Sequence, residues 1–387
     1  FYITLGHNGD IVKQYLNVAH SNLKLTFINV DKYVGNGSSL GYSLLCAMPF
    51  LQKPFIFHAC DTLIDREVPP PVTNWCGGYK KINSSFYSTL NIEGDKVKKI
   101  NPKGEINYDL EYIGISGIKD YRLFWDTLTA LHSKSPNNSH LNDCDCIREM
   151  MKDVAFNVVR FPVWNDIGNI DSLVKSKQFY GSKYTVLDKD KESIYFFDNR
   201  VIKFFSDSDI NKKRVERVKH LNNLVPRILN STKNFYCYEH IAGNLASDFI
   251  NDKNIQDLMN WAKTNLWVNK TQNPENLIKC KRFYIDKTIK RVEMLSEQIG
   301  KPDGVDKING LNVPSVFDML SSIKSEDLFS EDFYNFHGDF ILENIIITKD
   351  SFKLIDWRQD FAGDLEVGDI YYDLAKLNHN LIINHDI

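Results

Sequence analysis

Residues 54–61, PFIFHACD, constrain the fold most, because a strand this apolar must be buried on both faces. Strand-like LKLTFINV and helix-like LGYSLLCAMPFLQ precede it, so that strands and helices alternate along residues 1–180. Alternation of buried strands with helices is typical of a doubly wound, mainly parallel sheet. We therefore expect an α/β domain of this kind over residues 1–181.

Two acidic residues in this region are candidates for a ligand site. Asp61 follows the apolar strand directly, and ligands of doubly wound sheets bind at the carboxyl ends of the strands. Asp166 follows an extended segment and precedes the turn at Gly168. An alternative for Asp61 is that it only caps a turn or a helix.

Three segments of this region resemble a known enzyme family. VGNGSSLGYSLLCAMPFLQKPFIFHACDTLI, YIGISGI and WNDIGNIDSL occur in the order seen in sugar-phosphate nucleotidyltransferases. The resemblance implies that Asp61 and Asp166 hold Mg²⁺, and that the turn formed by Ser39, Leu40 and Gly41 approaches the base of a nucleoside triphosphate. The family's Gly-rich loop would lie upstream of Phe1, so we expect this chain to lack the first strand and that loop.

The chemistry of nucleotidyl transfer agrees with this pair of acids. A phosphate oxygen of the substrate attacks the α-phosphorus of a nucleoside triphosphate, and pyrophosphate leaves. Because both reactants are anions, the site must neutralise charge and align the reactants, which Mg²⁺ held by two carboxylates can do.

The pattern changes after about residue 182. YTVLDKDKESIYFFDNRVIKFF is typical of antiparallel strands, and INKKRVERVKHLNNLV is typical of an amphipathic helix. Lys203 in the strand and Glu216 in the helix can form an ion pair that places the ammonium group on the phosphates of ATP, as in protein kinases. Lys203 can equally extend its ammonium group to solvent from an edge strand.

The segment NFHGDFILENIIITKDSFKLIDW, residues 335–357, contains two short apolar strands around a turn. Asp339, Asn344 and Asp356 would then lie at the ends and connections of a small hairpin. Carboxylates and amides held on loops by a rigid hairpin are what a site for Mg²⁺ and phosphate requires.

FHGDFILEN, LIDW and GDIYYDLAKL resemble segments of the aminoglycoside phosphotransferase and choline kinase superfamily. The resemblance implies a two-lobed α+β, protein-kinase-like domain with a small lobe at 182–237 and a large lobe at 238–387, which we expect to be truncated at its C-terminus. It also implies that Asp339 accepts the proton of the substrate hydroxyl and that Asn344 and Asp356 hold the Mg²⁺ ions on ATP. His337 would support the loop.

Composition excludes some partners. A net charge of −3 provides no basic surface for nucleic acid. No apolar run reaches the roughly 20 residues of a membrane span. Seven scattered cysteines are typical of reduced thiols, so we expect a cytoplasmic protein with small-molecule substrates. The oligomeric state does not follow from the sequence.

Together the two motif sets predict a bifunctional kinase and nucleotidyltransferase. The kinase would phosphorylate a hydroxyl substrate, expected to be a sugar, with ATP. The transferase would join the product to a nucleotide from a second nucleoside triphosphate, giving an activated sugar for a surface polysaccharide. Two alternatives stay open: a choline or amino-alcohol kinase with a cytidylyltransferase, and a binding or scaffold protein whose transferase half is degenerate.

Overall fold

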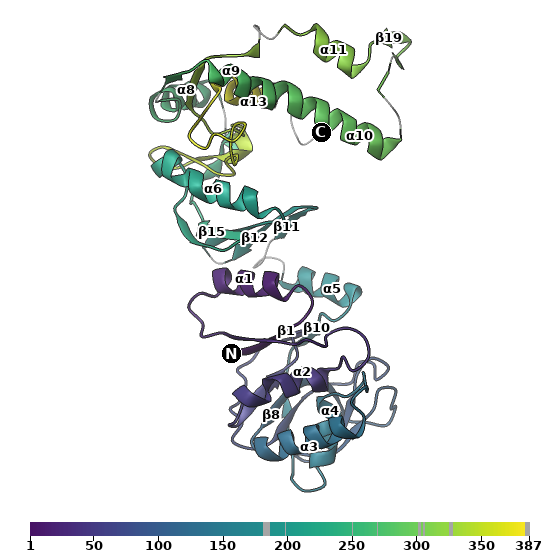
Figure 1. Cartoon of the computed structure of the whole chain (residues 1–387). Coiled ribbons are helices and arrows are strands. Elements are labelled where there is room, and N and C mark those ends of the chain that lie inside the picture. Colours follow the sequence, from purple (N-terminus) through teal and green to yellow (C-terminus); the bar gives the residue numbers. More distant parts are fainter. Residues whose placement is uncertain are drawn as a thin grey trace. The chain divides into compact units, whose positions relative to one another are not determined.

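The computed structural model describes residues 1–180, 186–197, 199–249, 251–268, 270–300, 303–304, 306–324 and 328–383. The chain divides into two compact units, Phe1–Thr185 and Val186–Ile387, and Figure 1 colours both along the sequence. The domain boundary predicted between residues 181 and 182 lies outside the described residues. Among the residues with described positions, no helix combines the length and apolar character needed to cross a membrane.

The first unit is an α/β structure. Its strands are β1 (Tyr2–Leu5), β2 (Thr26–Asn29), β3 (Phe55–His58), β4 (Thr62–Ile64), β5 (Trp75–Tyr79), β6 (Thr89–Glu93), β7 (Lys96–Asn101), β8 (Leu110–Ile118), β9 (Asn157–Arg160) and β10 (Trp164–Asp166). Its helices are α1 (Gly9–Ala19), α2 (Leu40–Ala47), the 3-10 turn Met48–Phe50, α3 (Tyr121–Lys134), α4 (Asp143–Met150) and α5 (Ile170–Tyr180).

The main sheet of this unit is mixed. Its order is β3-β8-β5-β9-β7-β6, and among the described strands only β5 and β9 pair parallel within it. β1 and β2 form a separate parallel pair. The prediction of a mainly parallel sheet is therefore wrong for the described strands. An apolar run indicates that a strand is buried, but it does not show in which direction the neighbouring strand runs.

Strand β3 is buried on one face only. It lies at the edge of the described sheet and pairs with β8. Phe55 and Phe57 point into the core, whereas Ile56 is 39% exposed. Phe55 stacks on Trp125 of α3 with ring centroids 5.1 Å apart. Each large apolar side chain buried in this way contributes about 1.5–3 kcal/mol, so this core fixes the strand whose end carries Asp61.

The second unit begins with an antiparallel sheet. Its strands are β11 (Val186–Lys189), β12 (Glu192–Phe197), β13 (Arg200–Phe205), β14 (Ile228–Ser231) and β15 (Phe235–Glu239), in the order β11-β12-β13-β15-β14. Helix α6 (Ser208–Leu221) packs along this sheet, and the 3-10 turn Asn222–Leu224 follows it (Figure 1). The antiparallel strands and the amphipathic helix predicted from the sequence are confirmed.

The rest of this unit is mainly helical. The helices are α7 (Ala246–Phe249), α8 (Asp252–Asn265), α9 (Glu275–Cys280), the π-helical turn Lys281–Asp286, α10 (Lys287–Ile299), α11 (Val316–Ser322), the 3-10 turn Leu342–Asn344 and α13 (Ile370–Ile382). Small sheets join β16 (Asn244–Leu245) to β21 (Ile345–Ile347) and β22 (Phe352–Leu354), β17 (Thr271–Gln272) to β20 (Asp332–Asn335) and β23 (Val367–Gly368), and β18 (Asp306–Ile308) to β19 (Leu311–Val313).

Candidate active sites

In the first unit, a short strand pair brings Asp61 and Asp166 together. β4 starts directly after Asp61 and pairs antiparallel with β10, so that Thr62 lies opposite Asp166. The backbone N–H of Ile167 also donates to the Asp61 carbonyl oxygen at 2.8 Å. These backbone contacts join two segments that lie about 100 residues apart in the sequence.

The two carboxylates face one small space beside Gly168. A Cβ atom added to Gly168 would lie 2.9 Å from Asp61 Oδ2 and 3.2 Å from Asp166 Oδ1. Both acids line a pocket of about 460 Å³, together with Tyr87 and Lys103. Because carboxylate oxygens are preferred ligands of Mg²⁺, which is commonly held by one or two carboxylates plus substrate phosphates, the residues present fit this ion.

The two acids differ in their surroundings. Asp166 accepts hydrogen bonds from the Tyr87 hydroxyl at 3.1 Å, the Gly168 backbone N–H at 3.1 Å and the Asn169 amide at 3.3 Å. The exposed Asp61 carboxylate has no hydrogen bond or ion pair within the described ranges of the chain. Burial, with the nearby charge of Asp166, raises the pKa of Tyr87 to about 12, so its hydroxyl remains a donor.

The predicted base-binding turn lies beside this pocket. The Ser39 side chain caps helix α2 by accepting from the Tyr42 backbone N–H at 3.1 Å. Gly41 packs so closely on Leu141 that an added Cβ would lie 2.5 Å from Leu141 Cγ. Between them, Leu40 forms part of the pocket wall. Roles for Ser39 and Gly41 in nucleotide binding stay predictions.

In the second unit, the predicted hairpin is confirmed. β21 and β22 pair antiparallel, with Ile345 opposite Leu354. Asn344 precedes β21 and Asp356 follows β22, so both lie at the same end of the hairpin, and the Ile355 backbone N–H donates to the Asn344 carbonyl oxygen at 2.9 Å. Asp356 has a positive φ of 59°, a conformation that few residues other than glycine adopt. Such backbone conformations concentrate at functional sites.

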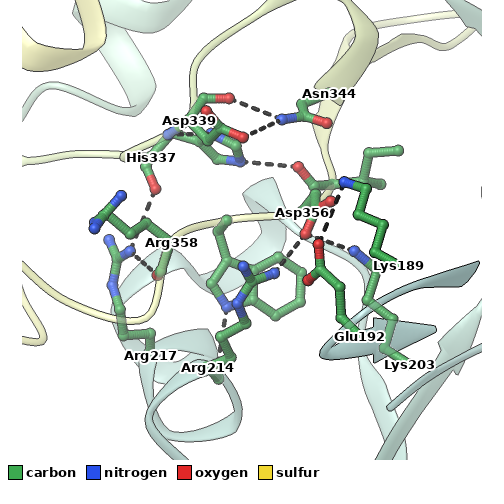
Figure 2. A network of polar contacts seen from close by, with 12 residues as sticks. Lys189, Glu192, Lys203, Arg214, Arg217, His337, Asp339, Asn344, Asp356 and Arg358 are labelled. Carbon is green, nitrogen blue, oxygen red and sulfur yellow. Dashed lines mark hydrogen bonds and ion pairs between the residues drawn. The ribbon is translucent and has the colours of Figure 1, made fainter. Parts of the chain in front are cut away.

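Asp339 lies next to Asn344, with the carboxylate between two donors. The Asn344 amide donates to Asp339 Oδ2 at 3.1 Å and to the Asp339 carbonyl oxygen at 3.0 Å. Lys376 Nζ lies 2.8 Å from Asp339 Oδ1. Figure 2 shows Asn344 pointing toward Asp339, with Asp356 nearby.

Asp356 is held by two cations. Its Oδ1 atom lies 2.5 Å from Lys203 Nζ and also pairs with Arg214 (Figure 2). Burial alone would raise the pKa of Asp356, but the charges of Lys203 and Arg214 hold it well below its usual range. The carboxylate is therefore ionised, as a metal ligand must be.

The predicted ion pair between Lys203 and Glu216 is not formed. Lys203 instead pairs with Asp356. Glu216 lines a separate pocket on α6 and β14, with Ser231. The reason is the helical period. Arg214 faces Asp356, and a residue two positions further along a helix points about 200° away from it.

His337 supports the loop, as expected. Its ring is buried, and burial lowers its pKa to about 4. Nε2 lies 3.0 Å from the Ile355 carbonyl oxygen, so it must carry the proton, while Nδ1 accepts from the Asp339 backbone N–H at 3.3 Å. The Asp373 carboxylate accepts from the backbone N–H groups of His337 at 2.7 Å and Gly338 at 2.6 Å.

Sequence reasoning missed several residues of this site. Arg217 is buried and donates to the carbonyl oxygens of Phe336, His337, Arg358 and Leu365, which fixes the loop around Asp339 (Figure 2). Arg214, Asp373 and Lys376 were also missed. In KKRVERVKH, Arg214 and Arg217 look like part of a solvated surface; the apolar residues that alternate with the charges are the only signal that one side of the helix is buried.

Comparisons of this chain with known proteins find similarity among solved structures. No family model and no curated protein matches the chain. Among solved structures, a protein assigned as a glucose-1-phosphate thymidylyltransferase from Bacillus anthracis aligns with TM-score 0.40 and 17% identity, covering 46% of this chain and 74% of that chain. The inositol-1-phosphate CTP transferase from T. maritima aligns with TM-score 0.37 and 15% identity, covering 47% and 75%.

A third similar structure is the CTP:phosphocholine cytidylyltransferase from Streptococcus pneumoniae. It aligns with TM-score 0.38 and 14% identity, covering 46% of this chain and 77% of that chain. All three alignments have TM-scores of 0.40 or lower and identities of 17% or lower. Because each alignment covers less than half of this chain at low identity, the activity has to be argued from the geometry of the sites.

Proposed function

We propose that the chain is a bifunctional transferase. The unit Val186–Ile387 transfers the γ-phosphoryl group of ATP to a small hydroxyl substrate. The unit Phe1–Thr185 transfers a nucleotidyl group to a phosphorylated substrate. The observation that carries the proposal is the meeting of functional side chains from distant segments on one site in each unit, Asp61 with Asp166 in the first and Lys203 with Asp356 in the second.

For the kinase activity, the support is the arrangement around Asp356 and Asp339. Lys203 and Asp356 form an ion pair of 2.5 Å, and Asn344 donates to Asp339 at 3.1 Å. In phosphoryl transfer a lysine binds the phosphates, an acid and an amide bind Mg²⁺, and a second acid accepts the hydroxyl proton. Lys203, Asp356, Asn344 and Asp339 match these four roles in that order. Bound Mg²⁺ supplies charge neutralisation on the phosphates.

For the nucleotidyl transfer, the support is the pocket that Asp61 and Asp166 share. One carboxylate is oriented by three hydrogen bonds and the other is exposed. This gives one fixed and one adaptable oxygen ligand for the metal of a nucleoside triphosphate. Lys103 in the same pocket adds a cation that can bind a phosphate group.

A sugar as the shared substrate links the two activities, because a sugar phosphate made in the second unit is a substrate for nucleotidyl transfer in the first. The product would be a nucleotide-activated sugar for a surface polysaccharide. Choline or another amino alcohol is the second candidate, since the LIDW motif is compatible with a choline kinase.

The experiment is a substrate panel with the intact protein. ATP consumption is measured with free sugars and amino alcohols, and pyrophosphate release is then measured with the phosphorylated products and each nucleoside triphosphate. Asp61→Ala and Asp166→Ala should each eliminate pyrophosphate release while ATP-dependent phosphorylation persists. If either variant loses both activities without unfolding, the proposal of two separate sites is wrong.

A further inference from the structure

Four cationic side chains of the second unit lie close enough to interact electrostatically, and two of them adjoin the Asp339 loop: Lys376 contacts Asp339, and Arg358 packs against Gly338. Lys287 and Arg291 belong to α10, Arg358 follows the Asp356 loop, and Lys376 belongs to α13. Lys376 Nζ contacts Asp339 Oδ1 at 2.8 Å. We call these four residues the cationic cluster. The Asp356 side of the site has different cations, Lys203 and Arg214.

The ring of Phe283 holds two members of the cluster next to each other. Phe361 stacks on this ring with centroids 4.2 Å apart and an interplanar angle of 17°, which covers one face. Lys287 Nζ lies 4.6 Å and Arg358 Cζ 4.8 Å from the ring centroid. Arg358 also reaches the Tyr372 hydroxyl at 3.4 Å. Both cations are therefore positioned by aromatic contacts and not by acids.

The cluster lacks matching negative charge. Asp339 is paired with Lys376, and the other nearby acid, Asp360, is paired with Lys213 at 3.2 Å. Within the parts of the chain that the structure describes, Lys287, Arg291 and Arg358 form no ion pair, and Arg358 Nε is buried without a hydrogen-bond partner.

This concentration of like charge affects Lys287. Burial, followed by the charges of Arg358, Arg291 and Lys376, lowers the pKa of Lys287 to about 8. The charge of Asp360 acts in the opposite direction but does not offset burial and the three cations, and like charges this close disfavour the protonated state of one another. A bound anion would relieve this repulsion, so the cluster is suited to bind a negative group.

We propose that the substrate whose hydroxyl group gives its proton to Asp339 also carries an anionic group, a carboxylate or a phosphate. Arg358 and Lys287 bind this anionic group. The inference rests on the proposed kinase function, in which Asp339 accepts the hydroxyl proton. The planar guanidinium of Arg358 can bind a carboxylate or phosphate with two parallel hydrogen bonds. A quaternary ammonium substrate would meet repulsion at the same place, which favours a sugar acid or sugar phosphate over choline.

The test compares matched acceptors with the full chain. ATP turnover is measured with glucose, glucuronate, glucose 6-phosphate and choline, and binding of glucuronate and glucose 6-phosphate is measured separately by calorimetry without ATP. The two anions distinguish a carboxylate from a phosphate. The variants are Arg358→Gln and Lys287→Gln, and Lys290→Gln on the exposed surface of α10 is the matched control.

We expect at least one anion to bind and to be preferred over glucose and choline. Arg358→Gln and Lys287→Gln should each weaken binding of the preferred anion about tenfold or more, and the loss in turnover should appear mainly as a higher KM for the acceptor. Lys290→Gln should change neither. If Arg358→Gln does not fold, Lys287→Gln alone tests the inference. Preference for glucose or choline, or a change confined to the KM for ATP, would overturn the inference while leaving the kinase function intact. Absence of ATP binding would refute the kinase function, and the calorimetry would still decide on anion binding.

Discussion

Lys203 Nζ lies 2.5 Å from Asp356 Oδ1, although Lys203 belongs to β13 of the five-stranded sheet and Asp356 follows β22 of a separate sheet. Lys203 is only 3% exposed. A buried ammonium group requires a nearby negative charge, because the cost of removing it from water is otherwise several kcal/mol. The pair therefore fixes the position of the ammonium group relative to the proposed metal ligand.

Replacing Lys203 should mainly weaken ATP binding. In Lys203→Met the apolar stem is kept and Asp356 still has Arg214 as a partner. We therefore expect the free energy of unfolding to fall by less than the roughly 3–5 kcal/mol that removing one partner costs when the other charge is left unpaired. The Kd for MgATP should rise about tenfold or more, because a charge-assisted contact to phosphate is lost. Calorimetric titration measures this, with the exposed Lys219→Met as a control. An unchanged Kd would remove Lys203 from phosphate binding.

Asp339→Asn separates chemistry from binding. The amide keeps the shape and can still accept from Asn344, but it cannot take up the hydroxyl proton. Turnover should fall by about 10²–10⁴-fold while the affinity for ATP remains nearly unchanged. Single-turnover kinetics together with ATP titration test this, and Asp350→Asn on an exposed turn is the matched control. Near-normal turnover would show that Asp339 is not the base.

Local patterns in the sequence were enough to predict the hairpin and the positions of Asn344 and Asp356 at its end. The decisive feature of the hairpin is a short stretch in which apolar residues and a turn alternate. The expectation that Asp61 and Asp166 share a site came instead from the resemblance of residues 1–180 to sugar-phosphate nucleotidyltransferases.

The direction of the strands in the first unit and the partner of Lys203 could not be predicted in this way. Both depend on which segments meet in three dimensions. The charged helix carrying Arg214 and Glu216 shows the difficulty, since either residue could face the site. The packing of α6 on the sheet decides which of the two residues faces the site. The partner of Lys203 is Asp356, an acid from a distant loop.

Gly168 offers a test of the first site that leaves both acids in place. In Gly168→Ala the new methyl group would lie 2.9 Å from Asp61 Oδ2 and 3.2 Å from Asp166 Oδ1, so at least one carboxylate must shift. Because a misplacement of about 1 Å can reduce a rate about 100-fold, pyrophosphate release should fall strongly while kinase activity is unchanged. Gly304→Ala, where nothing lies within 4 Å, is the control. Normal pyrophosphate release in Gly168→Ala would argue against a shared metal at this position.

The last prediction concerns two buried groups of the Asp339 loop with opposite effects on stability. Burial lowers the pKa of His337 from 6.5 to about 4, so the folded state binds fewer protons than the unfolded state, and stability gained from His337 rises with pH across this range. Burial raises the pKa of Asp373 from 3.8 to about 6, despite the hydrogen bonds it accepts, so stability falls with rising pH over nearly the same range.

Removing either group should therefore expose the effect of the other. The quantity to compare is the free energy of unfolding of each variant minus that of the unchanged chain. As the pH rises from about 4 to about 6, this difference should increase for Asp373→Asn and decrease for His337→Gln. The amide at 373 also places a donor against backbone N–H groups, which lowers stability at every pH by about 1–3 kcal/mol and leaves the slope unaffected. Urea unfolding of both variants across this pH range measures the two slopes. Slopes of the same sign would contradict the opposing pKa shifts.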